Sequence, residues 1–281
     1  MENLVSTQWL ADQLGSSDLV LLDASAHLPD AKRDPAAEFA TGHIPGARFL
    51  DLASFFDPDS PVPASLPNAK QFAQRMAALG VPNGARVVVY DDSYVKTAAR
   101  AWFIMRMHGV AQVAILDGGL DKWRSEGRAL ESGMVDLAPT AYTATKGPGS
   151  VRSKADVLAN LEEAKEQVVD ARGVKRFTGE DKDFRPNVDD GHIPGSRNVS
   201  FDSVLNPNGT YKNPAEIEAA FRAAGVNLAQ PLITTCGGGV TAAVLLFALE
   251  LAGKHDVALY DGSWSEWGSD PALPKELGPA L

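Results

Sequence analysis

The pentapeptide Gly-His-Ile-Pro-Gly fills residues 42–46 and occurs again at residues 191–195. Two further motifs recur in the same order, an Asp-Gly pair within 116–119 and within 260–263, and an Asp-Ala pair at 23–24 and at 170–171. The copies lie 144 to 149 residues apart. A period this long exceeds that of a solenoid unit, so we interpret the chain as two copies of one domain.

Each half alternates short apolar segments with amphipathic ones. We expect strands over 19–25, 86–92, 113–116, 168–171, 232–236 and 257–260, and helices over 68–79, 97–108, 153–164, 214–224 and 240–252. Short apolar strands between amphipathic helices are typical of a parallel sheet that is covered on both faces. The expected fold class is therefore α/β, with two tandem domains of this kind.

The boundary between the copies is predicted from composition. Residues 132–150 are rich in Gly, Pro, Ser and Thr and show no apolar period, which is typical of a linker. We expect one domain over residues 1–131 and the other over residues 151–281.

The charge and the cysteine count indicate which partners and which cellular compartment suit the chain. The chain has 281 residues and a formal net charge of −10, which disfavours nucleic acid or an anionic membrane surface as a partner. With one cysteine it forms no internal disulfide, and its five histidines show no metal-ligand spacing. No signal peptide is apparent, and the longest apolar run, 242–249, is far below the roughly 20 residues of a membrane span. We expect a cytoplasmic monomer that needs no cofactor and no metal.

The single cysteine, Cys236, stands where an expected strand ends and an expected helix begins. Ligands of open α/β sheets bind at such carboxyl ends of strands. Gly237, Gly238 and Gly239 follow it, and they let the backbone wrap tightly and point several N–H groups inward. The helix that begins near Val240 adds its positive N-terminal end, and together these features would stabilise a thiolate. The alternative is a buried cysteine beside an ordinary glycine turn, and the three glycines favour the nucleophile.

The other copy serves as an internal control. A constant offset of 144 residues pairs Cys236 with Asp92, in a loop without a nucleophile and without glycines. We therefore expect residues 1–131 to be catalytically inactive and residues 151–281 to carry the chemistry.

These motifs together resemble the tandem-domain rhodanese sulfurtransferases over nearly the whole chain. The resemblance rests on the repeated pentapeptide, on the two Asp-Gly segments that are each followed by a tryptophan, and on Cys-Gly-Gly-Gly-Val-Thr-Ala at 236–242. It implies two rhodanese-like domains, of which the second carries the active cysteine. The small, neutral loop is similar to that of the members that use 3-mercaptopyruvate, because members that prefer thiosulfate usually carry basic residues where this chain has Gly237 and Gly238. Mercaptopyruvate-using members usually have Ser at the place of Gly238; its role is either dispensable here or taken by water or Thr241.

The resemblance also implies the substrate-binding residues. Arg176 and Arg185 match two pocket arginines of the family, and an arginine fork suits a carboxylate; the alternative is two solvated loop arginines. The loop residues Gly237, Gly238, Gly239, Val240 and Thr241 are expected to cradle the substrate. Arg172 is a weaker candidate that would otherwise form a structural ion pair. Asp34 and His43 resemble a family pair that faces a cleft, although His43 would equally suit a hydrogen bond within its own turn.

The function that the resemblance implies is transfer of sulfur from 3-mercaptopyruvate to a thiol, cyanide or thioredoxin-like acceptor, through a Cys236 persulfide and with release of pyruvate. A thiosulfate sulfurtransferase is the nearest alternative. A non-catalytic persulfide carrier or redox-sensing module would show no appreciable turnover. A cysteine phosphatase of the Cys-x5-Arg type would need arginine at position 242, which is Ala242.

Overall fold

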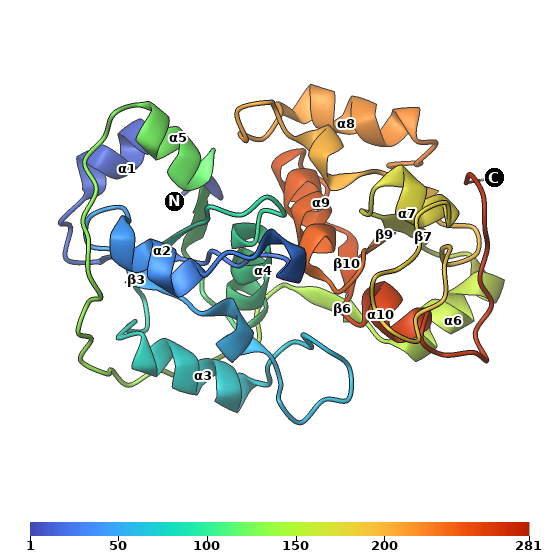
Figure 1. The fold of residues 1–281 in the computed structure, drawn as a ribbon, viewed down its shortest axis with the longest axis horizontal. Coiled ribbons are helices and arrows are strands. Elements are labelled where there is room, and N and C mark those ends of the chain that lie inside the picture. The colour runs from blue at the N-terminus through green and yellow to red at the C-terminus, as the bar shows by residue number, and fades with distance from the viewer. Residues whose placement is uncertain (281) are drawn as a thin grey trace. The chain divides into compact units, whose positions relative to one another are not determined.

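In the computed structural model, which describes residues 1–280, each half of the chain builds its own five-stranded parallel sheet. The described residues divide into two compact units. Unit 1 comprises residues 1–57, 66–149 and 207–210, and unit 2 comprises residues 58–65, 150–206 and those from 211 onward. Figure 1 labels their elements along the chain.

The sheet of unit 1 has the strand order β1-β5-β4-β2-β3. Its strands are β1 (Leu4–Val5), β2 (Leu19–Asp23), β3 (Arg48–Phe49), β4 (Arg86–Tyr90) and β5 (Val113–Leu116). Its helices are α1 (Thr7–Gln13), α2 (Pro35–Thr41), α3 (Ala69–Ala78), α4 (Ala98–Met107) and α5 (Gly119–Ser125), with 3-10 turns η1 (Pro29–Ala31) and η2 (Leu52–Phe55).

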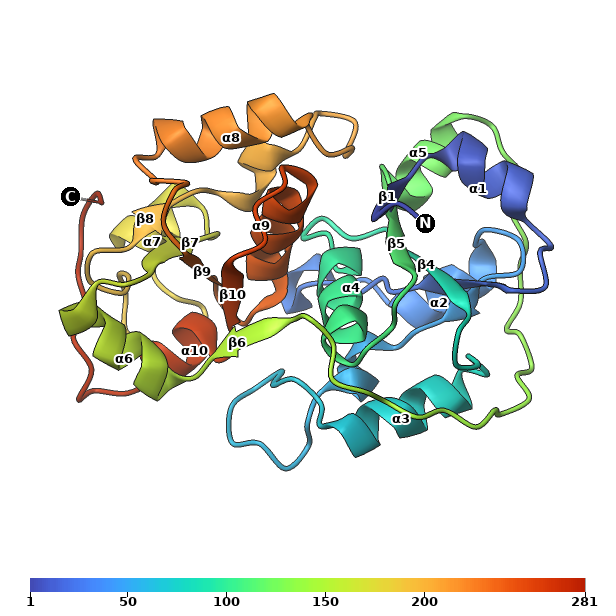
Figure 2. The same cartoon turned by 180° about the vertical axis from the view of Figure 1, so that it is seen from behind.

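The sheet of unit 2 repeats this order as β6-β10-β9-β7-β8 (Figure 2). Its strands are β6 (Ser150–Arg152), β7 (Gln167–Asp170), β8 (Arg197–Asn198), β9 (Leu232–Thr235) and β10 (Val257–Tyr260). Its helices are α6 (Lys154–Glu163), α7 (Val174–Thr178), α8 (Pro214–Ala223), α9 (Val240–Leu251) and α10 (Ser263–Trp267), with one 3-10 turn, η3 (Phe201–Val204).

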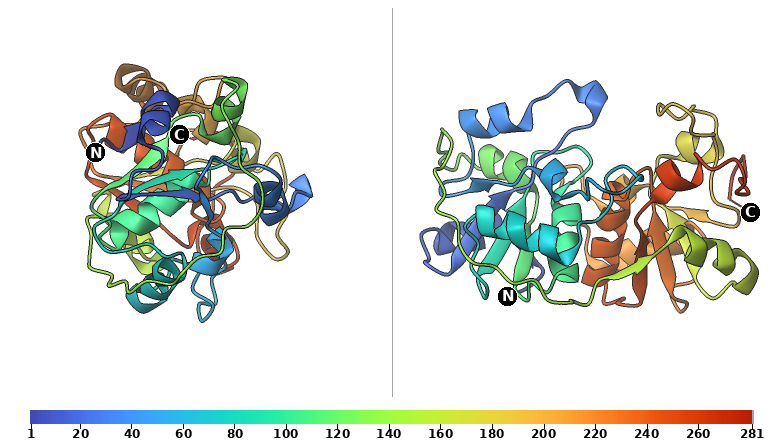
Figure 3. Two further views of the ribbon diagram at one scale, coloured as in Figure 1. Left: turned by 90° about the vertical axis from the view of Figure 1, so that its left-hand side faces the viewer. Right: turned by 90° about the horizontal axis from the view of Figure 1, so that it is seen from below.

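Both sheets are buried between helices (Figure 3). In unit 1, α1, α2 and α5 bury Leu10, Phe39 and Trp123 against one face, while α4 packs on the other. In unit 2, α6 and α10 cover one face through Val157 and Trp267, and α9 packs on the other. The central strands, such as β5 and β10, are covered on both sides and consist of apolar side chains throughout.

The expected fold class is confirmed, and the main elements lie within about two residues of their predicted bounds. Strands β5 and β10 coincide with the prediction, and β9 ends one residue earlier, at Thr235, which leaves Cys236 in the following loop. Helix α6 begins with the capping box that its sequence indicates, since Ser153 and Asp156 bond each other's backbone N–H groups. The sequence gives no clear signal for β1, β3, β6 and β8, or for the helices α1, α2, α5, α7 and α10.

The segment predicted as a linker runs along unit 1 without regular secondary structure until Ser150 opens β6. The backbone N–H groups of Thr140, Thr145 and Gly147 donate to carbonyl oxygens of unit 1 at 2.8 to 3.2 Å. These bonds fasten the segment to unit 1. No helix within residues 1–280 has both the length and the apolar character that a bilayer span requires.

Candidate active site

Cys236 lies directly beyond β9, on a loop that is tied to the start of α10. Its backbone N–H donates to the Ser263 hydroxyl at 3.2 Å, and its carbonyl accepts from the N–H of Trp264 at 2.9 Å. The carbonyl of Gly237 accepts from the N–H of Ser265 at 2.9 Å. The thiol is free, and the residue is 2% exposed. The peptide groups on either side of the cysteine are therefore held firmly.

The rest of the loop leaves its donors available. Gly239 has a φ of 78°, a left-handed conformation that favours glycine, and it precedes α9 without a side-chain cap. No backbone N–H of residues 237–241 donates a hydrogen bond within the part of the chain that the structure describes. The first N–H groups of a helix have no partner inside the helix. The loop thus has several N–H groups without a partner among the described residues.

Gly238 is roomy. A Cβ placed there would meet only the Ser265 hydroxyl, at 3.9 Å. The absence of a side chain at Gly238 therefore does not come from crowding. Ser265 is 7% exposed, and its hydroxyl donates to the carbonyl of Gly262.

Arg176 and Arg185 come together in unit 2 through one carboxylate. Arg176 is on α7, and Arg185 is on the loop that follows it. Asp183 Oδ2 accepts from Arg176 Nη2 at 2.6 Å, and its two oxygens accept from Arg185 Nη1 at 3.0 and 3.1 Å. The ring of Phe184 lies under both guanidinium groups, at 4.8 and 4.7 Å from its centroid. The two arginines are thus held as a pair.

Arg185 reaches the cysteine loop. A Cβ on Gly237 would stand 2.4 Å from Arg185 Nη2, so the guanidinium rests on the residue that follows Cys236. Burial lowers the pKa of Arg185 and the charge of Arg176 acts in the same direction, while Asp183 and Cys236 oppose the shift. Since arginine titrates far above neutral pH, the group remains a cation. The neutral loop therefore receives a positive charge from a neighbouring segment.

The weaker candidates have structural contacts. Arg172 and Asp170 form a buried ion pair at 2.7 Å, with 3% and 1% of their side chains exposed. His43 is fully buried, its ring stacks on that of Phe39 at 3.9 Å between centroids, and its Nδ1 bonds the backbone carbonyl of Phe39. Asp34 caps α2 by accepting from the N–H groups at 36 and 37. Arg172 thus has the alternative role, the structural ion pair, whereas His43 bonds a carbonyl of helix α2 and not one of its own turn.

The second copy of the histidine behaves in the same way. His192 stacks on Phe177 at 3.7 Å and bonds its carbonyl through Nδ1. In both units the histidine thus bonds a carbonyl of the preceding helix, which points to a shared structural role.

The residue of unit 1 that corresponds to Cys236 is Asp91, and the pairing with Asp92 is wrong by one position. In unit 1, Val113 of β5 pairs with Val87 of β4. In unit 2, Val257 of β10 pairs with Leu232 of β9. Val257 follows Val113 by 144 residues, but Leu232 follows Val87 by 145, so β4 and β9 correspond with an offset of 145. Helices α4 and α9 keep the offset of 144 at their last residues, Met107 and Leu251. Five residues separate Asp91 from Thr97, but four separate Cys236 from Thr241. A constant offset fails because the loop of unit 1 is one residue longer.

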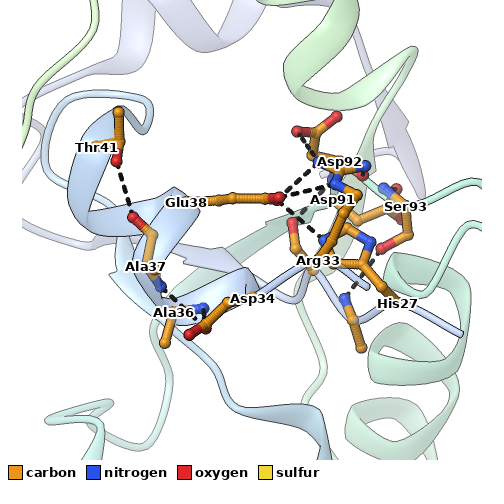
Figure 4. A network of polar contacts seen from close by, with 12 residues as sticks. His27, Arg33, Asp34, Ala36, Ala37, Glu38, Thr41, Asp91, Asp92 and Ser93 are labelled. Carbon is orange, nitrogen blue, oxygen red and sulfur yellow. Dashed lines mark hydrogen bonds and ion pairs between the residues drawn. The ribbon is translucent and has the colours of Figure 1, made fainter. Parts of the chain in front are cut away.

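The Asp91 side chain accepts hydrogen bonds from backbone N–H groups of its loop and of the following helix start, whereas the equivalent N–H groups of unit 2 have no partner among the described residues. Its carboxylate accepts from the N–H of Ser93 at 3.0 Å and from that of Ala98, at the start of α4, at 2.6 Å. Burial raises the pKa of Asp91. The neighbouring Asp92 bonds Arg33 at 2.9 Å, and Arg33 also bonds Glu38 (Figure 4). In unit 1, Asp91 therefore takes the N–H group at the start of α4, and the carboxylates of Glu38 and Asp92 pair with Arg33.

The comparisons identify the family. The family model of the rhodanese-like domain matches residues 6–126 and 153–270. The chain is 42% identical over 270 residues to the 3-mercaptopyruvate sulfurtransferase of Mus musculus, covering 94% of this chain and 91% of the relative. It is 39% identical over 273 residues to the thiosulfate sulfurtransferase of Cricetulus griseus, covering 94% and 91%.

A solved structure agrees. The crystal structure of the 3-mercaptopyruvate sulfotransferase SseA from Escherichia coli matches with a TM-score of 0.86 and 38% identity, covering 95% of this chain and all of that one. The chain belongs to the rhodanese family, as its motifs indicate. Within that family it is a sulfurtransferase enzyme with two rhodanese domains.

Sequence reasoning missed three residues of the site. Asp183 and Phe184 connect the arginines, and Ser263 holds the peptide N–H of Cys236. The only signal for Asp183 is its place two residues before Arg185. That spacing alone does not show that the carboxylate also reaches Arg176.

Proposed function

We propose that this enzyme takes sulfur from 3-mercaptopyruvate and carries it as a persulfide on Cys236. The observation that supports this donor best is the contact of Arg185 with Gly237, because it brings one arginine fork beside a loop without charged side chains. A fork of this kind binds a carboxylate through two parallel hydrogen bonds. Relatives named for 3-mercaptopyruvate add support.

In the first step the Cys236 thiolate attacks the sulfur of the donor thiol. An S–S bond forms, the carbon–sulfur bond breaks, and its electron pair becomes the enolate of pyruvate, which then takes a proton. The developing negative charge on the ketone oxygen would be stabilised by Arg176 or Arg185. The product is a Cys236 persulfide, whose charge the free N–H groups of residues 237–241 would stabilise.

In the second step a thiol, cyanide or a reduced thioredoxin-like protein attacks the outer sulfur. The new bond forms on that sulfur, the S–S bond to Cys236 breaks, and the thiolate returns. Covalent catalysis of this type gives ping-pong kinetics. Cys236, Arg176 and Arg185 all belong to unit 2, so a monomer would suffice, and a thiol-reducing compartment such as the cytoplasm suits the sole cysteine.

Unit 1 would be catalytically inactive in this scheme. Asp91 stands at the position of the nucleophile, and its carboxylate already takes the N–H at the start of α4. Arg33 is likewise engaged by Glu38 and Asp92.

Thiosulfate is the second candidate donor, because a relative named for it is nearly as similar. Rates of pyruvate release from mercaptopyruvate and of thiocyanate formation from thiosulfate and cyanide decide between the two. We expect mercaptopyruvate to be the better donor. Faster turnover of thiosulfate would contradict the proposal.

The nucleophile is tested on the intact protein. Incubation with donor should add one sulfur atom to the protein mass, and a reductant should remove it, because the chain has a single thiol. Cys236→Ser should acquire no sulfur and should show no turnover while retaining its fold. Full activity of this variant would exclude the mechanism.

A further inference from the structure

Asp183 is a buried carboxylate that is saturated with cationic and backbone donors. Its side chain is 2% exposed, while those of Arg176 and Arg185 are 27% and 23% exposed. Besides the two guanidinium groups, the backbone N–H of Arg185 donates to its Oδ1 at 3.0 Å. Burial by itself would raise the pKa of Asp183, but this N–H and the two arginines outweigh it and lower the pKa. Asp183 is therefore ionised at neutral pH.

Each arginine has an N–H group without a hydrogen-bond partner among the described residues. Arg185 gives Nη1 to Asp183, and its Nη2 rests against Gly237 without a hydrogen-bond partner among residues 1–280. Arg176 gives Nη2 to Asp183, and its Nε is buried and has no partner in the same part of the chain. Asp183 thus takes one side of the pair and leaves donors of both arginines unused.

The charges of this group do not cancel. Two guanidinium cations and one carboxylate leave a single positive charge, and no other carboxylate bonds either arginine among the described residues. Asp190 lies one step further away, since its carboxylate accepts from the backbone N–H of Asp183 at 2.8 Å. With the Cys236 thiolate included the site is neutral before a donor binds, so a donor with two negative charges leaves twice the excess negative charge that a donor with one leaves.

We propose that Asp183 is a specificity-determining residue, which cancels one guanidinium charge and thereby matches the pocket to a monoanionic carboxylate donor rather than a dianion such as thiosulfate. This inference rests on the proposed function. Asp183 acts through Arg176 and Arg185 and touches no reacting atom.

The test compares donors in Asp183→Asn. Asparagine keeps one acceptor oxygen for the arginines but removes the negative charge. Both activities should fall because the arginines are held less well. The dianion gains twice as much as the monoanion from the added positive charge, so the ratio of kcat/KM for thiosulfate to that for mercaptopyruvate should rise about tenfold, or about 1.4 kcal/mol.

Two matched variants separate charge from geometry. Asp183→Glu keeps the charge and disturbs the contacts, so it should lower both activities without changing the ratio. Asp181→Asn removes a charge from an exposed position of the same loop and should leave both the activities and the ratio unchanged. If Asp183→Asn retains its fold and lowers both activities equally, Asp183 only positions the arginines and the inference is overturned.

A measurement on the unchanged protein guards against a variant that does not fold. Pyruvate should protect Cys236 from alkylation by iodoacetamide at lower concentration than sulfate does, because pyruvate carries one charge and sulfate two. Better protection by sulfate would overturn the inference. Failure of the proposed function is a separate result, since it appears as absent pyruvate release by the wild-type enzyme before any variant is made.

Discussion

Replacing Gly237 with alanine would displace Arg185 with little disturbance to the fold. The new Cβ would stand 2.4 Å from Arg185 Nη2, and ordinary contact begins near 3.4 Å, so the guanidinium must retreat by about 1 Å. Gly237 has no left-handed φ, and the obstructing atom is the end of a flexible side chain. We expect a cost in the free energy of unfolding of about 1 kcal/mol.

The catalytic effect should be much larger. A misplacement of about 1 Å in a positioning group costs roughly 100-fold in rate, which corresponds to about 2.7 kcal/mol of transition-state stabilisation. Initial rates of pyruvate release from mercaptopyruvate give kcat/KM for the variant, and a thermal melt followed by circular dichroism reports its stability.

Gly238→Ala is the matched control. Its Cβ would meet only the Ser265 hydroxyl at 3.9 Å, so the rate should change less than about threefold. A folded Gly237→Ala enzyme with wild-type kcat/KM would show that Arg185 does not position the donor. An equal loss in both alanine variants would show that the loop tolerates no side chain at all.

Three further outcomes follow from contacts described above. Arg172→Ala leaves Asp170 buried and unpaired, so urea unfolding should show a loss of about 3–5 kcal/mol; a loss below about 1 kcal/mol would contradict the structural role. Asp92→Ala should leave kcat/KM for mercaptopyruvate within about twofold of wild type, and a loss as deep as that of Cys236→Ser would place chemistry in unit 1. The pKa of Asp183 is lowered from 3.8 in the folded protein, so the unfolded chain binds this proton first as the pH falls. In melts at successive pH values, the stability advantage of the wild type over Asp183→Asn should be constant above about pH 5 and shrink below about pH 4. An undiminished advantage at about pH 3 would refute this.

The sequence was sufficient to predict the central strands of both sheets because these are buried on both faces. The run of β4 is apolar after Arg86, and long helices such as α3 carry caps. Strands of two residues, such as β1 and β3, hold too few side chains to show a period. Their existence depends on partners far along the chain.

The site was predictable only where it is local. Cys236 and its glycines are contiguous, so their chemistry is visible in the sequence. The position that corresponds to Cys236 was misplaced onto Asp92, because an insertion of one residue leaves the offset of the helices intact and changes that of the strands. The contacts of Asp183 with Arg176 and of Arg185 with Gly237 depend on how one loop folds over another, which no periodicity records.

The longer loop of unit 1 would make it hard to build a second cysteine site there by substitution alone. A substitution could place cysteine at position 91, but five residues without a glycine would still separate it from Thr97. A glycine-lined cradle of the length found after Cys236 requires a deletion together with several substitutions. Intermediates on that route would disrupt the capping carboxylate of Asp91 before they gained any reactivity. A difference of one residue in loop length thus keeps the two units from exchanging roles through substitutions alone.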